Sequence, residues 1–243
     1  MKTALVTGAS RGIGKAIALQ LARDGYAVAV HCVRAVDAAQ AVCDAITAQG
    51  GCAKVYVCDV ADGEAVDAMV QSITDEFGAV DVLVNNAGIA QQKLFSDITP
   101  KEWRRMMAVH VDGAYYTCRA CLPHMISQHR GTIVNVASMW GQVGASCEVH
   151  YSTAKAALIG MTKALAKEVG PAGVRVNCVA PGVIMTDMMA GFDEDTLAEL
   201  ADETPLCRLG TPKDVAAAVS FLVSDRADFI TGQVLAPNGG YVI

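Results

Sequence analysis

The feature that most constrains the fold of this chain is a regular alternation of short apolar runs with longer helical patterns. The apolar runs are Ala4–Thr7, Ala27–Cys32, Ala53–Val57, Val80–Val84, Thr132–Val136 and Val174–Val179. The helical patterns between them are Ile13–Asp24, Asp37–Gln49, Asp62–Phe77, two longer helices before Thr132, and Val149–Val169. Strands that alternate with helices in this way predict an α/β fold with a doubly wound parallel sheet between two helix layers. Ligands of such folds bind at the carboxyl ends of the strands.

Composition bounds the size and class of the protein. With 243 residues, 53% of them hydrophobic and 18% charged, the whole chain (1–243) is expected to form a single domain around a large core. The net charge of −6 argues against a nucleic-acid partner, because phosphate binding needs a basic face. The first strand begins at Thr3 without a signal segment before it, and no apolar run approaches the roughly 18 residues that span a bilayer. We therefore expect a cytoplasmic protein and no membrane contact.

The cysteines do not indicate disulfides or a metal site. The nine residues are scattered and odd in number, and several stand inside apolar runs, as buried thiols do in reducing compartments. Cys118 and Cys121 form a C-x-x-C pattern, but no second pair and no histidine at ligand spacing accompany it. We expect these two side chains to pack on a helix.

The turn after the first strand predicts a phosphate cradle. Thr7 to Gly14 reads T-G-A-S-R-G-I-G and leads into a helix. Its glycines let the backbone turn sharply and approach a pyrophosphate, while the helix N-terminus offers unpaired N–H groups and the positive end of the helix dipole. The expected contacts come from Gly8, Ser10, Arg11, Gly12, Ile13 and Gly14.

A second constellation predicts acid–base chemistry. Tyr151 and Lys155 stand four residues apart, so a helix over Val149–Val169 places the phenol and the ammonium on one face. Because nearby positive charge favours the phenolate, we expect the lysine, together with a positively charged cofactor ring, to lower the pKa of Tyr151 by a few units from about 10. Ser138 follows the run Thr132–Val136, so its hydroxyl stands at a strand's carboxyl end and can hydrogen-bond a carbonyl oxygen beside Tyr151.

These features together resemble the short-chain dehydrogenase/reductase family from end to end. The resemblance rests on the glycine-rich turn, Asn85–Gly88, Tyr151 to Lys155, and Pro181–Gly182. It implies a Rossmann-type NAD(P)-binding domain with oxidoreductase activity. It also implies further cofactor contacts from Asp59, Val60, Asn86, Ala87, Gly88, Pro181, Gly182, Ile184 and Thr186, with Tyr151 and Lys155 at the nicotinamide ribose.

The end of the second strand bears on the choice of cofactor. An acidic residue there would bind the ribose 2'-hydroxyl of NAD, but this chain has Cys32, Val33 and Arg34. Arg34, with Arg11, can pair with a 2'-phosphate instead, so we expect NADPH/NADP rather than NAD. The alternative is that Arg34 is solvated surface.

The chain departs from the family pattern at one catalytic position. Family members usually carry an asparagine in the helix after Asn85–Gly88, where it steadies a water in the proton relay. Aligned on Trp103 and Gly113, this sequence has His110 there. Histidine can donate, accept and titrate near neutral pH, so His110 can serve that relay. His110 can equally be a packed helix residue, and both interpretations stay open.

Within the family, the chain most resembles bacterial 3-oxoacyl-[acyl-carrier-protein] reductases of fatty-acid synthesis, through the motifs above and the ending Thr231–Gln233. The expected reaction is hydride transfer to a ketone, with Tyr151 giving the proton and Ser138 holding the oxygen. An acidic carrier protein needs a basic docking surface. The candidates near the expected cleft rim, in a region poor in cations, are Arg130, Lys167 and Arg175.

Two other functions stay open. The stretch Trp140–Val149 is similar to a narrower group, proposed to reduce a 5-aminopentanone modification on elongation factor P. There Glu148 could attract a cationic substrate and Trp140 could line the pocket; helix-dipole complementation and ordinary packing are the alternatives. A candidate of a different class is a non-catalytic dinucleotide-binding sensor or scaffold, which would be expected to lack part of the catalytic trio.

Two last expectations concern mobility and assembly. The irregular stretch Pro181–Pro212, with a short helix at Asp193–Asp202, is predicted to form a mobile lid that brings Met188 to the substrate, although simple packing would give the same pattern. The resemblance implies a homotetramer formed through the central helices and the apolar C-terminal ending.

Overall fold

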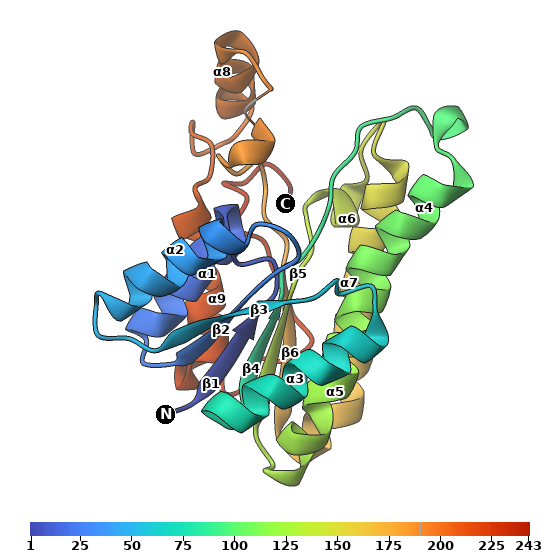
Figure 1. Ribbon diagram of the computed structural model, residues 1–243. Helices are drawn as coiled ribbons and strands as arrows, with labels where there is room; N and C mark the ends of the chain where they lie inside the picture. Colours follow the sequence, from blue (N-terminus) through green and yellow to red (C-terminus); the bar gives the residue numbers. More distant parts are fainter. Residues whose placement is uncertain (190) are drawn as a thin grey trace.

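The chain folds around a parallel sheet with helices on both faces (Figure 1). The computed structural model describes residues 1–189 and 191–243, and the side chain of Met188 also lies outside the description. The strands of the sheet are β1 (Thr3–Val6), β2 (Ala27–Cys32), β3 (Ala53–Val57), β4 (Val80–Asn85), β5 (Gly131–Val136), β6 (Val174–Val179) and β7 (Val234–Leu235). Their spatial order is β3-β2-β1-β4-β5-β6-β7, and all neighbours are parallel. The predicted doubly wound sheet is confirmed.

The order of the strands creates a switch point between β1 and β4. From β1 the chain winds outward through β2 and β3, then returns to the other side of β1 and winds outward through β4 to β7. The segments that follow β1 and β4 therefore leave the sheet in opposite directions, which opens a crevice at the carboxyl edge. This edge is where the site residues gather.

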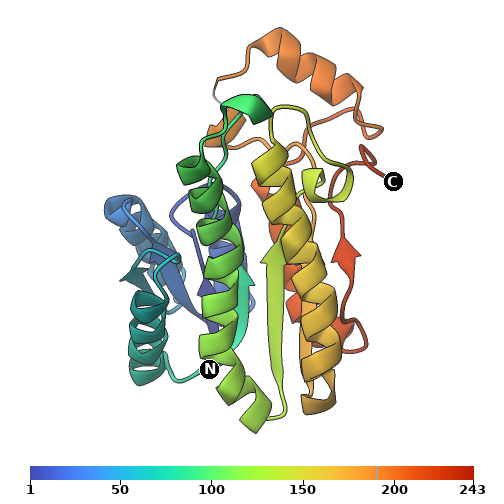
Figure 2. The same ribbon diagram turned by 90° about the vertical axis from the view of Figure 1, so that its right-hand side faces the viewer.

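Helices form the two outer layers (Figures 1 and 2). On one face lie α1 (Gly12–Arg23), α2 (Val36–Thr47) and α9 (Pro212–Val223). On the other lie α3 (Gly63–Phe77), α5 (Gly113–Ser127) and α7 (Val149–Val169). The shorter helices α4 (Pro100–Met107), α6 (Trp140–Val143) and α8 (Glu194–Asp202) stand toward the carboxyl edge. The three-layer α/β/α architecture thus agrees with the sequence pattern.

The helices are held by apolar faces at helical spacing. On α1 the buried positions include Ile17 and Leu21, one turn apart, and they pack against the valines of β1 and β2. Burying a leucine or isoleucine of this kind contributes about 1.5–3 kcal/mol. Cys118 and Cys121 lie buried in the core between α5 and the sheet, which confirms their predicted packing role. Among the described residues, no helix is both long and apolar enough to cross a bilayer.

Two details were not predicted. A π-helical turn, Ala108–Asp112, joins α4 to α5, so these helices run on as one bent segment. π-helical turns often accompany functional sites, because the wider turn re-aims the side chains within it. The apolar ending contributes β7, a strand of two residues beside β6.

Candidate active site

The predicted catalytic residues come together at the carboxyl edge. Ser138 stands two residues after β5, and Tyr151 and Lys155 lie on the same face of α7. The Lys155 Nζ atom is 5.5 Å from the centre of the Tyr151 ring, and the Ser138 hydroxyl lies close enough to the Tyr151 phenol to lower its pKa. Close packing of α6 on α7 secures this arrangement: a Cβ on Gly141 would lie 2.7 Å from the Lys155 carbonyl carbon.

Lys155 is a buried cation. Its side chain is only 4% exposed, and Nζ donates a 2.7 Å hydrogen bond to the Val136 carbonyl at the end of β5. Burial disfavours the charged form and lowers the pKa of Lys155 to about 8. The group therefore carries most of a positive charge at neutral pH, directly beside the tyrosine.

The pKa of Tyr151 differs from the expectation. Burial raises the pKa of Tyr151 to about 12, against a lowering effect of the nearby Ser138 hydroxyl, and the Glu148 carboxylate raises it further. The protein's own groups alone do not produce the expected fall in the pKa of Tyr151. Lys155 Nζ lies over the ring and donates its hydrogen bond to the Val136 carbonyl. The phenol consequently keeps its proton at neutral pH, which suits a proton donor.

His110 lies in the π-helical turn against Tyr151. It is 2% exposed, and its ring meets the tyrosine ring edge to face with centres 5.5 Å apart. Nε2 is 2.8 Å from the Ile89 carbonyl oxygen and 3.1 Å from the Ile89 nitrogen, so it donates to one or accepts from the other according to its tautomer. A Cβ on Gly88 would lie 2.5 Å from Cε1, so the glycine makes room for the imidazole.

His110 stays neutral at physiological pH. Burial and the positive charge of Lys155 lower its pKa to about 3, against a small opposing effect of the Ile89 hydrogen bond. The expectation that it titrates near neutral pH is therefore wrong. Its Nδ1 atom is buried and, among the described residues, has no hydrogen-bond partner.

The glycine-rich turn forms a tightly constrained cradle. Gly8 and Gly12 have φ values of +65° and +54°, which side chains rarely allow. Asn86, just after β4, donates from Nδ2 to the Thr7 carbonyl at 2.9 Å and to the Gly8 carbonyl at 3.1 Å. No side chain caps α1, so its first N–H groups face the turn without a side-chain acceptor.

The cradle lies close against the loop that follows β4. A Cβ on Gly8 would lie 2.9 Å from the Ala87 backbone, so the bare glycine lets the two loops approach each other. Ser10, Arg11 and Ile13 belong to the same turn and first helical turn, where a phosphate would meet backbone N–H groups. These residues fit the pyrophosphate of an NAD(P) cofactor.

The other expected cofactor contacts surround this cradle. Val60 is buried next to Asp59, whose carboxylate pairs with Arg105 at 2.8 Å and accepts from the Ala61 N–H at 3.0 Å. Thr186 lies over Gly12, with its Cγ2 3.5 Å from a Cβ built there. Pro181, Gly182 and Ile184 follow β6 on the way to Thr186.

Two arginines stand at the adenosine end. Arg34 is exposed two residues after β2, and Arg11 lies 3.9 Å from the Asp187 carboxylate in the segment after β6. Arg34 is free to turn because it is exposed, and Arg11 because an exposed ion pair at that distance is worth less than about 1 kcal/mol.

The substrate side contains a contact that the sequence did not indicate. Trp140 on α6 donates its backbone N–H to the Ser138 hydroxyl at 3.2 Å and packs edge to face on Tyr241, with ring centres 6.2 Å apart. The Tyr241 hydroxyl donates to Glu203 at 2.7 Å, just after α8. This chain of contacts ties the predicted lid segment to Ser138.

The predicted substrate residue Met188 has its side chain outside the part of the chain that the structure describes.

Glu148 is half-buried in front of α7. Its carboxylate accepts a 3.3 Å hydrogen bond from Gln92, and it has no ion-pair partner among the described residues. The negative charge is near enough to Tyr151 to raise its pKa.

The predicted carrier-docking cations are not at the cleft rim. Arg130 and Arg175 stand at the beginnings of β5 and β6, and Lys167 is in the last turn of α7, so all three lie at the amino edge of the sheet, opposite the catalytic residues. Arg175 is also engaged in the fold, donating to the Leu222 carbonyl at 2.8 Å and to Thr132 at 3.2 Å. The expectation failed because loops before and after a parallel strand lie at opposite edges.

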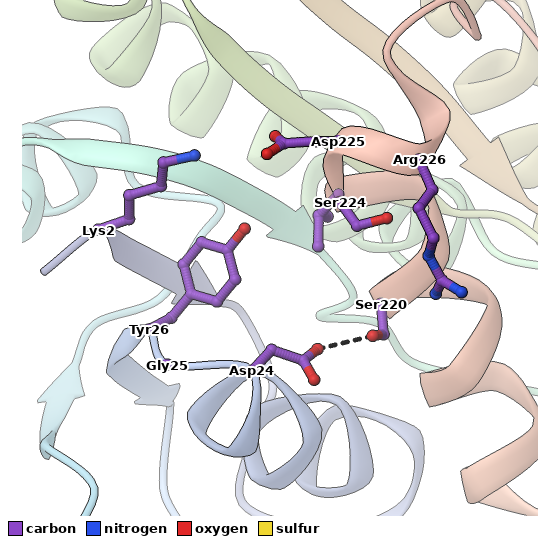
Figure 3. Close-up of a pocket in the computed structure, with 9 residues that line it drawn as sticks. Lys2, Asp24, Gly25, Tyr26, Ser220, Ser224, Asp225 and Arg226 are labelled. Atoms are coloured by element: carbon purple, nitrogen blue, oxygen red, sulfur yellow. Dashed lines mark hydrogen bonds between the residues drawn. The ribbon is translucent and has the colours of Figure 1, made fainter.

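A hollow lies at the amino edge of the sheet as well (Figure 3). It measures about 430 Å³ and is lined by Lys2 and Tyr26 near the starts of β1 and β2, and by Ser220, Asp225 and Arg226 near the end of α9. None of the predicted site residues lines it, so its size does not mark the catalytic site.

Comparisons with known proteins agree with this geometry. A family model described as "Enoyl-(Acyl carrier protein) reductase" matches residues 8–242. The 3-oxoacyl-[acyl-carrier-protein] reductase FabG of Staphylococcus aureus is 41% identical over 98% of this chain and 97% of its own length. FabG of Vibrio cholerae is 42% identical over 98% and 96%, and the uncharacterized oxidoreductase YmfI of Bacillus subtilis is 41% identical over 99% and 98%. The chain belongs to the short-chain dehydrogenase/reductase family, whose members are NAD(P)-dependent oxidoreductases.

Proposed function

We propose that the protein is an NADPH-dependent carbonyl reductase that converts a 3-oxoacyl group on acyl carrier protein to the secondary alcohol. The observation that carries the proposal is the convergence of the Ser138 hydroxyl, the Tyr151 phenol and the Lys155 ammonium beside the glycine-rich cradle. The similarity to FabG proteins over nearly the whole chain supports the choice of substrate.

Each member of the trio has a distinct task. NADPH, when bound, supplies the hydride that reaches the carbonyl carbon. Tyr151 holds its proton at neutral pH and donates it to the carbonyl oxygen, which Ser138 orients by a hydrogen bond. The positive charge of Lys155, at 5.5 Å from the ring centre, stabilises the phenolate that remains.

His110 then has a supporting task. Its Nε2 holds the Ile89 backbone, and a small cavity of about 10 Å³ beside its ring has room for roughly one water. A neutral imidazole can pass a proton by donating from one nitrogen and accepting at the other. We propose this relay role for His110 in place of the family's asparagine.

The preference for NADPH is proposed from Arg34 and Arg11. Hydrogen bonds to a charged group contribute about 1.5–3 kcal/mol, so Arg34→Asp should raise the KM for NADPH by at least about tenfold and leave that for NADH nearly unchanged. Arg226→Asp, the same charge change at the opposite edge of the sheet, is the control. An unchanged KM for NADPH in Arg34→Asp would refute the assignment.

A second substrate has a specific observation in its favour. Glu148 has no ion-pair partner among the described residues, and Glu203 lies beyond the aromatic pair Trp140 and Tyr241. Carboxylates and aromatic rings attract a cation, as the 5-aminopentanone modification of elongation factor P would require. The candidate docking cations at the amino edge do not favour the carrier protein.

One experiment separates the three functions. NADPH oxidation is measured with acetoacetyl groups on acyl carrier protein and with elongation factor P that carries the aminopentanone group, using wild type and Glu148→Gln. Preference for the carrier substrate, unaffected by Glu148→Gln, supports the first proposal. Preference for the cationic substrate, lost in Glu148→Gln, supports the second. NADPH binding without turnover of either ketone would favour a sensor or scaffold.

Assembly and lid movement are also proposals. Phe229, just before β7, is fully exposed, as a side chain in a subunit contact would be in an isolated protomer. We propose a homotetramer that covers Phe229. Phe229→Asp should dissociate this assembly, which light scattering would measure.

The segment that carries α8 is tied to Ser138 through Tyr241 and Trp140, which favours a lid that moves with substrate binding.

A further inference from the structure

His31 is a buried side chain near the cofactor cradle to which the sequence patterns gave no role. It lies on β2 and has no solvent exposure. Its Nδ1 accepts a 3.1 Å hydrogen bond from the Gly8 N–H, and its Nε2 lies 3.0 Å from the Cys58 carbonyl oxygen. Its own backbone carbonyl accepts from the Ala9 N–H at 2.8 Å. One residue of β2 therefore binds both the glycine-rich turn and the end of β3.

The two partners fix the state of the ring. A backbone N–H can only donate, so Nδ1 must carry a lone pair; a carbonyl oxygen can only accept, so Nε2 must carry the proton. Only the neutral imidazole with its hydrogen on Nε2 satisfies both Gly8 and Cys58. Burial lowers the pKa of His31, which maintains this neutral form.

The bond to Gly8 acts at the point where the chain turns from β1 into the cradle. Gly8 has φ +65°, and Asn86 holds its carbonyl from the β4 side. His31 holds its N–H from the β2 side. The glycine is thus bound at both of its polar backbone groups, which fixes the direction in which the following N–H groups point.

The bond to Cys58 acts at the other end of the same ligand site. Cys58 directly precedes Asp59 and Val60, the expected contacts of the adenine. Because the imidazole spans from the turn after β1 to the end of β3, it sets the separation of the two segments.

We infer that His31 is a positioning residue of the dinucleotide site, holding the phosphate cradle and the adenine-binding strand end at the separation that one NADPH molecule requires. The inference rests on the proposed use of NADPH. Its role is indirect: His31 acts through Gly8 and Cys58 and touches neither hydride nor substrate.

Two substitutions separate the two hydrogen bonds. His31→Asn places an amide oxygen close to the position of Nδ1 and keeps an acceptor for Gly8. His31→Gln places an amide nitrogen close to the position of Nε2 and keeps a donor for Cys58, but leaves the Gly8 N–H unpaired. Each variant loses one hydrogen bond, so the thermal midpoints of the cofactor-free proteins should fall by similar amounts.

The readout is the Kd for NADPH, measured by fluorescence titration of the cofactor-free protein. Both variants should bind NADPH more weakly than wild type, because each releases one of the two segments that the imidazole joins. His31→Asn should bind at least about threefold more weakly, and His31→Gln at least about tenfold more weakly, since it also leaves an unpaired N–H in the cradle. Wild-type affinity in either variant, or affinity losses that simply follow the thermal midpoints, would overturn the inference.

Other outcomes are equally decisive. If His31→Gln does not fold, His31→Ala, which keeps neither bond, takes its place, and a folded His31→Ala protein that binds NADPH as tightly as wild type overturns the inference. Wild-type protein that binds no NADPH would refute the proposed function and the role of His31 with it. Tight binding by wild type and by both variants would refute the role of His31 alone.

Discussion

Replacing Lys155 by methionine should change the pH dependence of stability in a way that the structure specifies. Methionine is similar in length and keeps the packing on α7, but it removes a positive charge from a site that is 4% exposed. The pKa of Lys155 is lowered to about 8 from its ordinary value of 10.5, mainly by burial. At about 1.4 kcal/mol for each pH unit, keeping the ammonium charged in the folded state costs about 3 kcal/mol.

The cost has a defined pH window. Below pH 8 the lysine is protonated in both the folded and the unfolded state, so the full cost is present. As the pH rises from 8 toward 10.5, the folded protein loses its proton first, and the cost falls away. Near neutral pH, Lys155→Met removes this cost and so gains stability. The Val136 carbonyl loses its hydrogen-bond donor at the same time, which offsets that gain by about 1–3 kcal/mol.

The measurement is urea unfolding of wild type and Lys155→Met at a series of pH values. The free energy of unfolding of wild type relative to the variant should rise by about 3 kcal/mol between about pH 7 and about pH 11. Subtracting the variant removes the contributions of other titrating groups. Two curves that stay parallel over this range would show that Lys155 is not a buried, charged group, and the proposed stabilisation of a phenolate would lose its basis.

Three other substitutions test the catalytic centre. Tyr151→Phe removes the proton donor and should lower kcat about a thousandfold while leaving the Kd for NADPH unchanged; substantial remaining turnover would refute its role. His110→Ala removes the proposed relay group and should slow turnover, but should not change the shape of the pH–rate profile from about pH 5 to about pH 9, because the pKa of His110 is about 3. A lost inflection near neutral pH would contradict that. Gly88→Ala places a Cβ 2.5 Å from the His110 ring and should cost about 1–3 kcal/mol of stability, and urea unfolding should show a smaller cost in a His110→Asn background.

The sequence predicted those features that local pattern determines. Runs of buried residues gave the strands, and the four-residue spacing of Tyr151 and Lys155 placed them on one face of α7. The glycine-rich turn was recognisable because positive φ values at Gly8 and Gly12 need glycine. In each case the information lies within a few consecutive residues.

What the sequence did not predict depends on contacts between distant segments. The partners of His31 are 23 and 27 residues away, and Tyr241 meets Glu203 across 38 residues. The position of Arg175 was misjudged because a charged residue at the beginning of a strand was assigned to the wrong edge of the sheet. Spacing also does not reveal burial, which raises the pKa of Tyr151, whereas the expected lowering with a bound cofactor stays a prediction.

Three buried basic side chains at the carboxyl edge illustrate how the site controls charge. Lys155, His110 and His31 each bind the backbone at or after the carboxyl end of a strand, at Val136, Ile89 and Cys58 respectively. Burial lowers the pKa of all three, but the two histidines start from 6.5 and become neutral, whereas the lysine starts from 10.5 and stays mostly charged at neutral pH. Among these three groups the positive charge is therefore concentrated on Lys155, beside the ring of Tyr151. A charged imidazole at His110 would be repelled by Lys155 and would leave the Ile89 N–H facing a second donor, so the neutral form of His110 fits both neighbours.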